Sequence, residues 1–170
     1  MKARVNQRFP DVMTVLTDHL TTNPDDDVCM IVNEDNVVKL IYVQTWHMKE
    51  VFNKFPEVLL VHGTYSINNS GMPLYSFLAE DGHGQWQIVG MMLLAGEDSN
   101  QIKCMIDIFS ESNPAMSCTH TVITDKDFTE IAAIEAVLLH AKLQQCTFHC
   151  IKAEQKKLVH CLSQLMTKCI

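Results

Sequence analysis

Apolar positions at helical spacing and continuous apolar runs divide the first part of this chain into helical and extended segments. Apolar residues return every three or four positions over residues 8–20 and 45–54, as in helices that bury one side. Between them, VCMIV (28–32) and VVKLIYV (37–43) flank the turn-forming sequence NEDN, which predicts a β-hairpin. Pro56 ends the second helix, because the residue before a proline disfavours the α region.

Three extended segments follow, joined by short turns. VLLVHGTY (58–65) carries apolar residues on both parities, which favours a central strand. PLYSFLA (73–79) and QWQIVGMMLLA (85–95) are joined by EDGHG, whose glycines suit a hairpin turn. We therefore expect three successive antiparallel strands.

Helices and strands alternate in the second half of the chain. A helix is expected after Ser99, which we predict to be its cap, and it should end at SESNP. A strand at 118–125, a helix begun by a capping box of Asp127 and Glu130, and a strand at 142–151 come next. A last helical pattern rests on Leu158, Leu162, Leu165 and Cys169.

The composition fits an intracellular globular domain. The 170 residues are 47% hydrophobic and 19% charged, and the longest apolar run is shorter than the roughly 20 residues of a membrane span. Seven cysteines without the spacing of a disulfide framework indicate reduced thiols, and we expect the protein in the cytosol or nucleus. The formal charge of -7 argues against a broad basic surface for nucleic acid, although a local basic patch stays open.

From residue 57 onward the predicted order is three sheet strands, helix, strand, helix, strand, helix. This order is that of the ribonuclease H-like fold, so we predict an α/β protein whose mixed sheet has three antiparallel strands, then parallel strands, with flanking helices. Residues 1–56 are predicted to form an N-terminal extension of helix, hairpin and helix, and residues 57–170 the core. Because the last helical pattern meets no glycine stop, we expect this core to be truncated at its C-terminus.

Three short sequences carry a more specific resemblance: VHGTYSIN (61–68), VITDKDF (122–128) and CTFH (146–149). Together they resemble the pattern of Mutator-like element transposases, in which an Asp-Gly-Thr-Tyr strand, a Thr-Asp-Lys-Asp strand end and a Cys-x-x-His follow in this order. The resemblance covers roughly residues 45–155 and extends to the domesticated descendants of these transposases that carry SWIM-type zinc fingers. It implies a nuclear protein.

The family's chemistry needs acids on neighbouring strands that hold two divalent ions at the scissile phosphate. The resemblance places the second acid on Asp125 but the first on His62. Imidazole offers one nitrogen lone pair, cannot bridge two ions and brings no negative charge, so magnesium should not bind. The family's third acid, a glutamate, is expected beyond Ile170. We therefore predict a pseudo-nuclease with no intact catalytic set and no expected cofactor.

Other interpretations of these residues stay open. Asp125 is either a relic of the metal site or a residue that orients the turn into the next helix. For His62 we prefer a hydrogen-bonded pair with Asp125. Cys146 and His149 have a spacing seen in zinc sites, but one strand would turn neighbouring ligands to opposite faces, so we prefer buried thiols with a satisfied histidine and keep zinc as the alternative.

The sequence is compatible with three functions. We favour a catalytically inactive, transposase-derived module of a larger nuclear protein that binds protein partners or nucleic acid, in transcriptional regulation. The alternative is a metal-dependent nuclease or transposase whose missing acids come from another segment or subunit. A DNA-binding module ranks third because of the negative charge.

Overall fold

The computed structural model describes residues 9–65, 70–124 and 128–147 of the chain. The elements follow one another as α1 (Phe9–Thr22), β1 (Asp27–Val32), β2 (Val38–Gln44), α2 (Trp46–Lys54), β3 (Val58–Thr64), β4 (Leu74–Glu80), β5 (Trp86–Leu94), α3 (Ser99–Ser112), a 3-10 helix (Pro114–Cys118), β6 (Thr121–Thr124), α4 (Phe128–Val137) and β7 (Lys142–Gln145).

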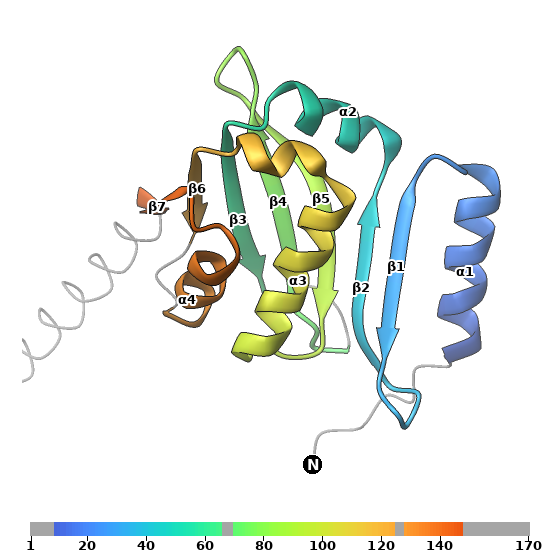
Figure 1. The fold of residues 1–170 in the computed structure, drawn as a ribbon. Helices are drawn as coiled ribbons and strands as arrows, with labels where there is room; N and C mark the ends of the chain where they lie inside the picture. The colour runs from blue at the N-terminus through green and yellow to red at the C-terminus, as the bar shows by residue number, and fades with distance from the viewer. Residues whose placement is uncertain (1–8, 66–69, 125–127, 148–170) are drawn as a thin grey trace, which may run out of the picture.

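All seven described strands form one mixed sheet in the order β1-β2-β5-β4-β3-β6-β7. The strands β3, β4 and β5 pair antiparallel, as predicted, and β6 and β7 extend the sheet in parallel with β3 (Figure 1). The predicted α/β class with a mixed ribonuclease H-like sheet is therefore confirmed. The hairpin of β1 and β2 belongs to the same sheet, because β2 pairs antiparallel with β5. The division at residue 56 stays a prediction.

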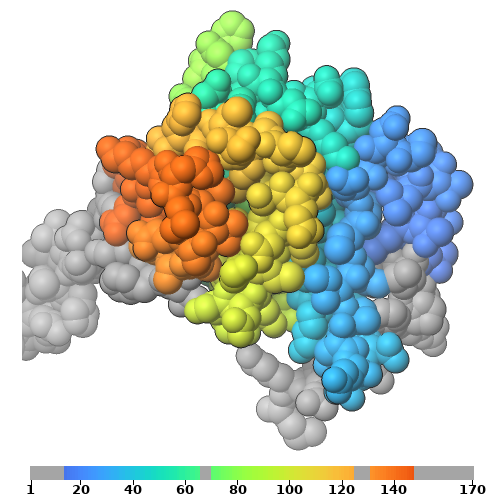
Figure 2. Space-filling model, viewed as in Figure 1, coloured from blue at the N-terminus to red at the C-terminus, as the bar shows by residue number. Residues whose placement is uncertain are grey.

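The core lies between the sheet and the helices α2, α3 and α4 (Figure 1). Phe109 of α3 is stacked on Phe77 of β4 at a centroid distance of 4.1 Å. The ring centroid of Phe52 of α2 lies 5.1 Å from that of Phe109. A Cβ at Gly90 would lie 3.0 Å from the Phe109 ring, so the close approach of α3 to β5 requires glycine there. In Figure 2, α3 and α4 pack side by side over this layer.

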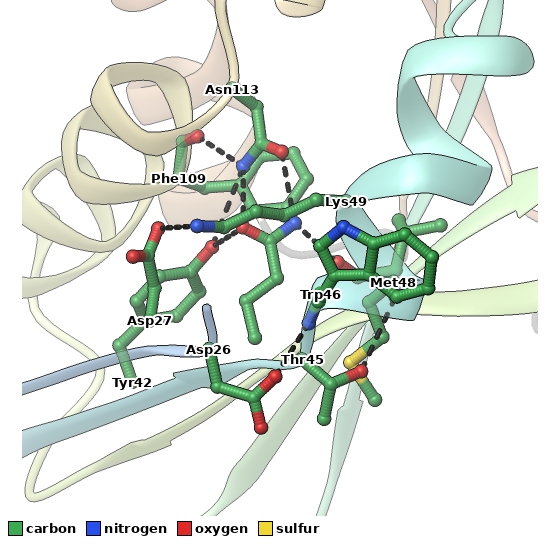
Figure 3. Close-up of polar contacts among 11 residues, drawn as sticks. Asp26, Asp27, Tyr42, Thr45, Trp46, Met48, Lys49, Phe109 and Asn113 are labelled. Atoms are coloured by element: carbon green, nitrogen blue, oxygen red, sulfur yellow. Dashed lines mark hydrogen bonds and ion pairs between the residues drawn. The ribbon is translucent and has the colours of Figure 1, made fainter. Parts of the chain in front are cut away.

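A buried polar network fastens the end of α3 to β2 (Figure 3). The Tyr42 hydroxyl donates to the Gln44 side-chain oxygen at 2.7 Å, and the Gln44 amide donates to Asn113 Oδ1 at 2.9 Å. The Asn113 amide donates to the Phe109 carbonyl at 2.8 Å. Because burial penalises the charged form, it raises the pKa of the Tyr42 hydroxyl far above its usual value. Tyr42 thus stays neutral, and all three side chains are hydrogen-bonded inside the core.

The start of α2 is fixed by polar contacts from its own cap and from the start of β1 (Figure 3). The Thr45 hydroxyl accepts from the Met48 backbone N–H, which caps the helix. Asp26 accepts from the Trp46 backbone N–H at 2.6 Å. Lys49 pairs with Asp27 of β1, with 2.6 Å between nitrogen and oxygen.

Several predicted boundaries are wrong. The 3-10 helix Pro114–Cys118 occupies the beginning of the strand predicted at 118–125, and β6 is limited to Thr121–Thr124. The strand predicted at 142–151 ends at Gln145. Asp98, and not Ser99, caps α3, because its carboxylate accepts from two backbone N–H groups of the first turn. The predicted capping residue Asp127 and the C-terminal helix lie outside the described residues.

Candidate functional site

Of the three short sequences that carry the family resemblance, two begin on the neighbouring strands β3 and β6, and the third begins directly after β7. β3 pairs with β6, and Leu60 is the partner of Ile123. β6 pairs with β7, and Thr124 is the partner of Gln145. Because parallel strands run in one direction, their carboxyl ends meet at one edge of the sheet. The fold therefore gathers the ends of β3, β6 and β7 where the resemblance predicts the site.

His62 lies on β3 close to this edge. Its partner across the antiparallel pair is Ser76 of β4, and its side chain is half-buried. The last partner pair of β3 and β6 is Leu60 and Ile123, and His62 lies two residues beyond Leu60 on β3. Asp125 lies outside the described residues, and the predicted pairing of His62 with Asp125 stays a prediction.

The residues that follow His62 bind a carboxylate that the sequence patterns did not single out. The Tyr65 hydroxyl donates to Glu97 Oε1 at 2.6 Å, and the Tyr75 hydroxyl donates to the same oxygen at 3.0 Å. A Cβ at Gly63 would lie 3.3 Å from the Tyr75 ring, so glycine leaves room for this ring beside the strand. The cluster Tyr65–Glu97–Tyr75 ties the end of β3 to the loop before α3.

The tyrosines that bind the Glu97 carboxylate and the His62 side chain belong to opposite faces of the sheet. Successive residues of a strand point to opposite faces of the sheet, and Gly63 and Tyr75 are on the buried face whereas His62 is on the other. Glu97 is thus bound from the buried side. The local sequence pattern did not predict the contact of Glu97 with Tyr65, because the two residues are 32 positions apart. It places Glu97 only directly before the cap Asp98.

Cys146 comes directly after β7. Its backbone N–H donates to the Thr124 carbonyl at 2.8 Å, which places it beside the end of β6, and its side chain is half-buried. Since the strand ends at Gln145, the prediction that strand alternation governs Cys146 is wrong. His149 lies outside the described residues. Within the described ranges, no group of three or more His, Cys, Asp or Glu side chains could hold a metal ion, and zinc at Cys146 and His149 stays open.

The mixed sheet, with the antiparallel strands β3, β4 and β5 followed by β6 and β7 in parallel with β3, defines a ribonuclease H-like protein. A protein-family model described as zinc finger SWIM domain-containing protein 1/3, RNaseH-like domain, matches residues 17–144. The chain belongs to this family. The match begins within α1 and ends within β7, so it includes the hairpin of β1 and β2 as well as the later strands. The predicted relation to SWIM-type zinc-finger proteins is confirmed.

None of the described helices has the length and apolar character that a membrane crossing would demand.

Proposed function

We propose that this chain is a domesticated, transposase-derived ribonuclease H-like module that does not cleave phosphodiester bonds. It serves in a larger nuclear protein, where it binds protein partners or nucleic acid in transcriptional regulation. The observation that carries the proposal is His62 on the interior strand β3, where the resemblance places the first acid of the transposases. The membership in the SWIM family supports the transposase-derived origin.

The chemistry of the side chain explains the loss of activity. A nuclease of this class needs a carboxylate that shares its negative charge between two divalent ions. Magnesium prefers hard oxygen ligands and near-octahedral geometry, and a histidine nitrogen on β3 meets neither need. Ser76 faces His62 from β4, and a serine hydroxyl adds no charge. The sheet and its helices would persist after this loss, because none of the core residues depends on the metal pair.

A nicking assay tests the loss of activity. The protein is incubated with supercoiled plasmid and magnesium or manganese, and we expect no metal-dependent conversion to nicked circles. The control is the Asp125→Ala variant, which removes the one remaining acid of the motif. Cleavage that requires the metal and disappears in this variant would show an active nuclease and overturn the proposal.

Calorimetry with a restored acid tests the assignment of His62. The His62→Asp variant should bind manganese more tightly than the wild type, because it places a second carboxylate at the motif, and His62→Asn is the control of equal size without charge. Stoichiometric magnesium binding by the wild-type protein would contradict the proposal directly.

The formal charge of -7 favours protein partners over broad contact with phosphates. Titration of a fluorescent duplex at two salt concentrations tests nucleic-acid binding, and steep loss of affinity with salt would indicate a local basic patch. Imaging of a fluorescent fusion of the full-length protein tests the nuclear location.

A further inference from the structure

Trp46 exposes a large aromatic side chain at a place where the backbone is held on two sides. The residue exposes 55% of its surface, although indole is among the side chains that bury the most apolar area. It is the first residue of α2, where the Asp26 carboxylate accepts from its backbone N–H and the Thr45 hydroxyl accepts from that of Met48 (Figure 3). An exposed tryptophan on a fixed backbone is typical of an anchor for a binding partner.

Acidic side chains flank this tryptophan. The exposed Asp25 comes directly before Asp26, and β1, which follows, starts beside the end of β2, from which α2 continues. Glu50 is exposed as well and lies four residues after Trp46 on α2, a spacing that brings two side chains to one side of a helix with Cβ atoms about 5–6 Å apart. We call Asp25, Asp26, Trp46 and Glu50 the Trp46 patch.

Two positive groups next to the patch already have acidic partners. Lys49 Nζ lies 2.6 Å from a carboxylate oxygen of Asp27, and His19 Nε2 lies 2.8 Å from the second oxygen of Asp26. Among the described residues, no ion pair involves Asp25 or Glu50. Two carboxylates beside the indole are therefore available to a positive group from outside the chain.

We propose that the Trp46 patch binds an arginine- and lysine-rich segment of a partner protein. The inference rests on the protein-binding role in the proposed function and names the chemistry of the partner. A guanidinium group stacks on an indole ring and at the same time donates hydrogen bonds to a carboxylate, which is the combination that Trp46 and Glu50 offer one helical turn apart. The formal charge of -7 attracts such a segment and repels the phosphates of a nucleic acid.

Fluorescence anisotropy with a labelled peptide tests the binding on the full chain. The probe is a peptide of alternating arginine and glycine, and its control has glutamine in place of every arginine. The arginine peptide should bind, less tightly at high salt, and the glutamine peptide should not. Trp46→Ala should weaken binding at least about fivefold, whereas Trp86→Ala, at the other exposed tryptophan, should leave it unchanged. No binding by the wild type, or an equal effect of both variants, would overturn the proposal.

Neutralised acids separate the patch from the charge of the whole chain. The double variant Asp25→Asn with Glu50→Gln should weaken binding of the arginine peptide at least about fivefold. The control, Glu34→Gln with Asp35→Asn, removes two charges in the turn between β1 and β2, at the opposite end of this hairpin, and should change the affinity by less than about twofold. Equal weakening by both double variants would show a response to net charge alone and would overturn the proposal.

Tryptophan fluorescence shows where the peptide lies, because the chain has two tryptophans. In Trp86→Phe the emission of Trp46 should change as the peptide binds, and in Trp46→Phe the emission of Trp86 should stay constant. A response of Trp86 alone would place the peptide elsewhere and overturn the proposal. Circular dichroism checks that each variant folds.

A DNA titration distinguishes the partner class. Binding of a fluorescent duplex that is tighter than that of the arginine peptide and is lost in Trp46→Ala would assign the patch to nucleic acid and overturn the proposal. The peptide assays contain neither plasmid nor divalent metal, so their failure would refute the partner class, whereas metal-dependent nicking would refute only the proposed loss of catalytic activity.

Discussion

Replacement of Asn113 by alanine tests whether the buried polar network holds α3 on the sheet. The Asn113 side chain is almost fully buried and joins two elements, since it contacts Gln44 of β2 and the Phe109 carbonyl near the end of α3, and its own backbone caps that helix. Alanine removes the amide and leaves the surrounding apolar contacts in place. The change therefore isolates the polar contribution.

The expected cost follows from the bonds that are lost. The Asn113 amide donates to Phe109 at 2.8 Å and to Gln44 at 3.1 Å, and its oxygen accepts from Gln44 at 2.9 Å. With a net value of about 1 kcal/mol for each of these bonds, the free energy of unfolding should fall by about 3 kcal/mol. Gln44 keeps its bonds to Tyr42 and to the Val89 carbonyl, which limits the loss. For a chain of this size, the melting temperature should fall by roughly 6–12 °C.

Urea denaturation followed by circular dichroism measures this cost. The matched control is Asn100→Ala in the exposed first turn of α3, which should change the free energy of unfolding by less than about 0.5 kcal/mol. Asn113→Asp adds a test of polarity, because a carboxylate at this place would face the Phe109 carbonyl and should destabilise the fold more at neutral than at acid pH. Equal stability of Asn113→Ala and Asn100→Ala would refute the reasoning.

Three further predictions concern other contacts of the fold. Asp98→Ala removes the cap of α3 and should lower the free energy of unfolding by about 1 kcal/mol in urea denaturation. Phe109→Ala removes the ring stacked on Phe77 and should cost about 3–5 kcal/mol, and an effect below 1 kcal/mol would contradict the described core. The Trp46 backbone N–H holds the pKa of Asp26 below its ordinary value of 3.8, so this carboxylate stabilises the fold above that pH and less as the pH falls through its folded-state pKa. Asp26→Asn should therefore lower the free energy of unfolding more at pH 7 than at pH 3. Denaturation curves of the wild type and the variant at both pH values measure this difference, and an equal difference at pH 7 and pH 3 would argue against the assignment.

Much of the fold followed from local pattern. Apolar runs bounded by turn residues predicted all seven described strands, and helical spacing predicted the four described α-helices, because both patterns reflect which residues an element buries. The degenerate site that the short sequence HGTY led us to predict at His62 stays a prediction. Pattern failed at strand ends, where β7 stops at Gln145, since the length of a strand depends on its partner and not on its own residues.

By itself, the sequence determined the class of fold and the succession of elements, because these depend on side-chain type and local spacing. Only the tertiary structure decided which polar residues are buried. Gln44 and Asn113 are of residue types usually found on the surface, yet in the core they form a hydrogen bond with each other across 69 positions of the sequence. The same holds for Glu97, which meets Tyr65 across 32 positions. The reason is physical: a hydrogen bond between distant segments exists only once the sheet has set their distance, and no local period encodes it.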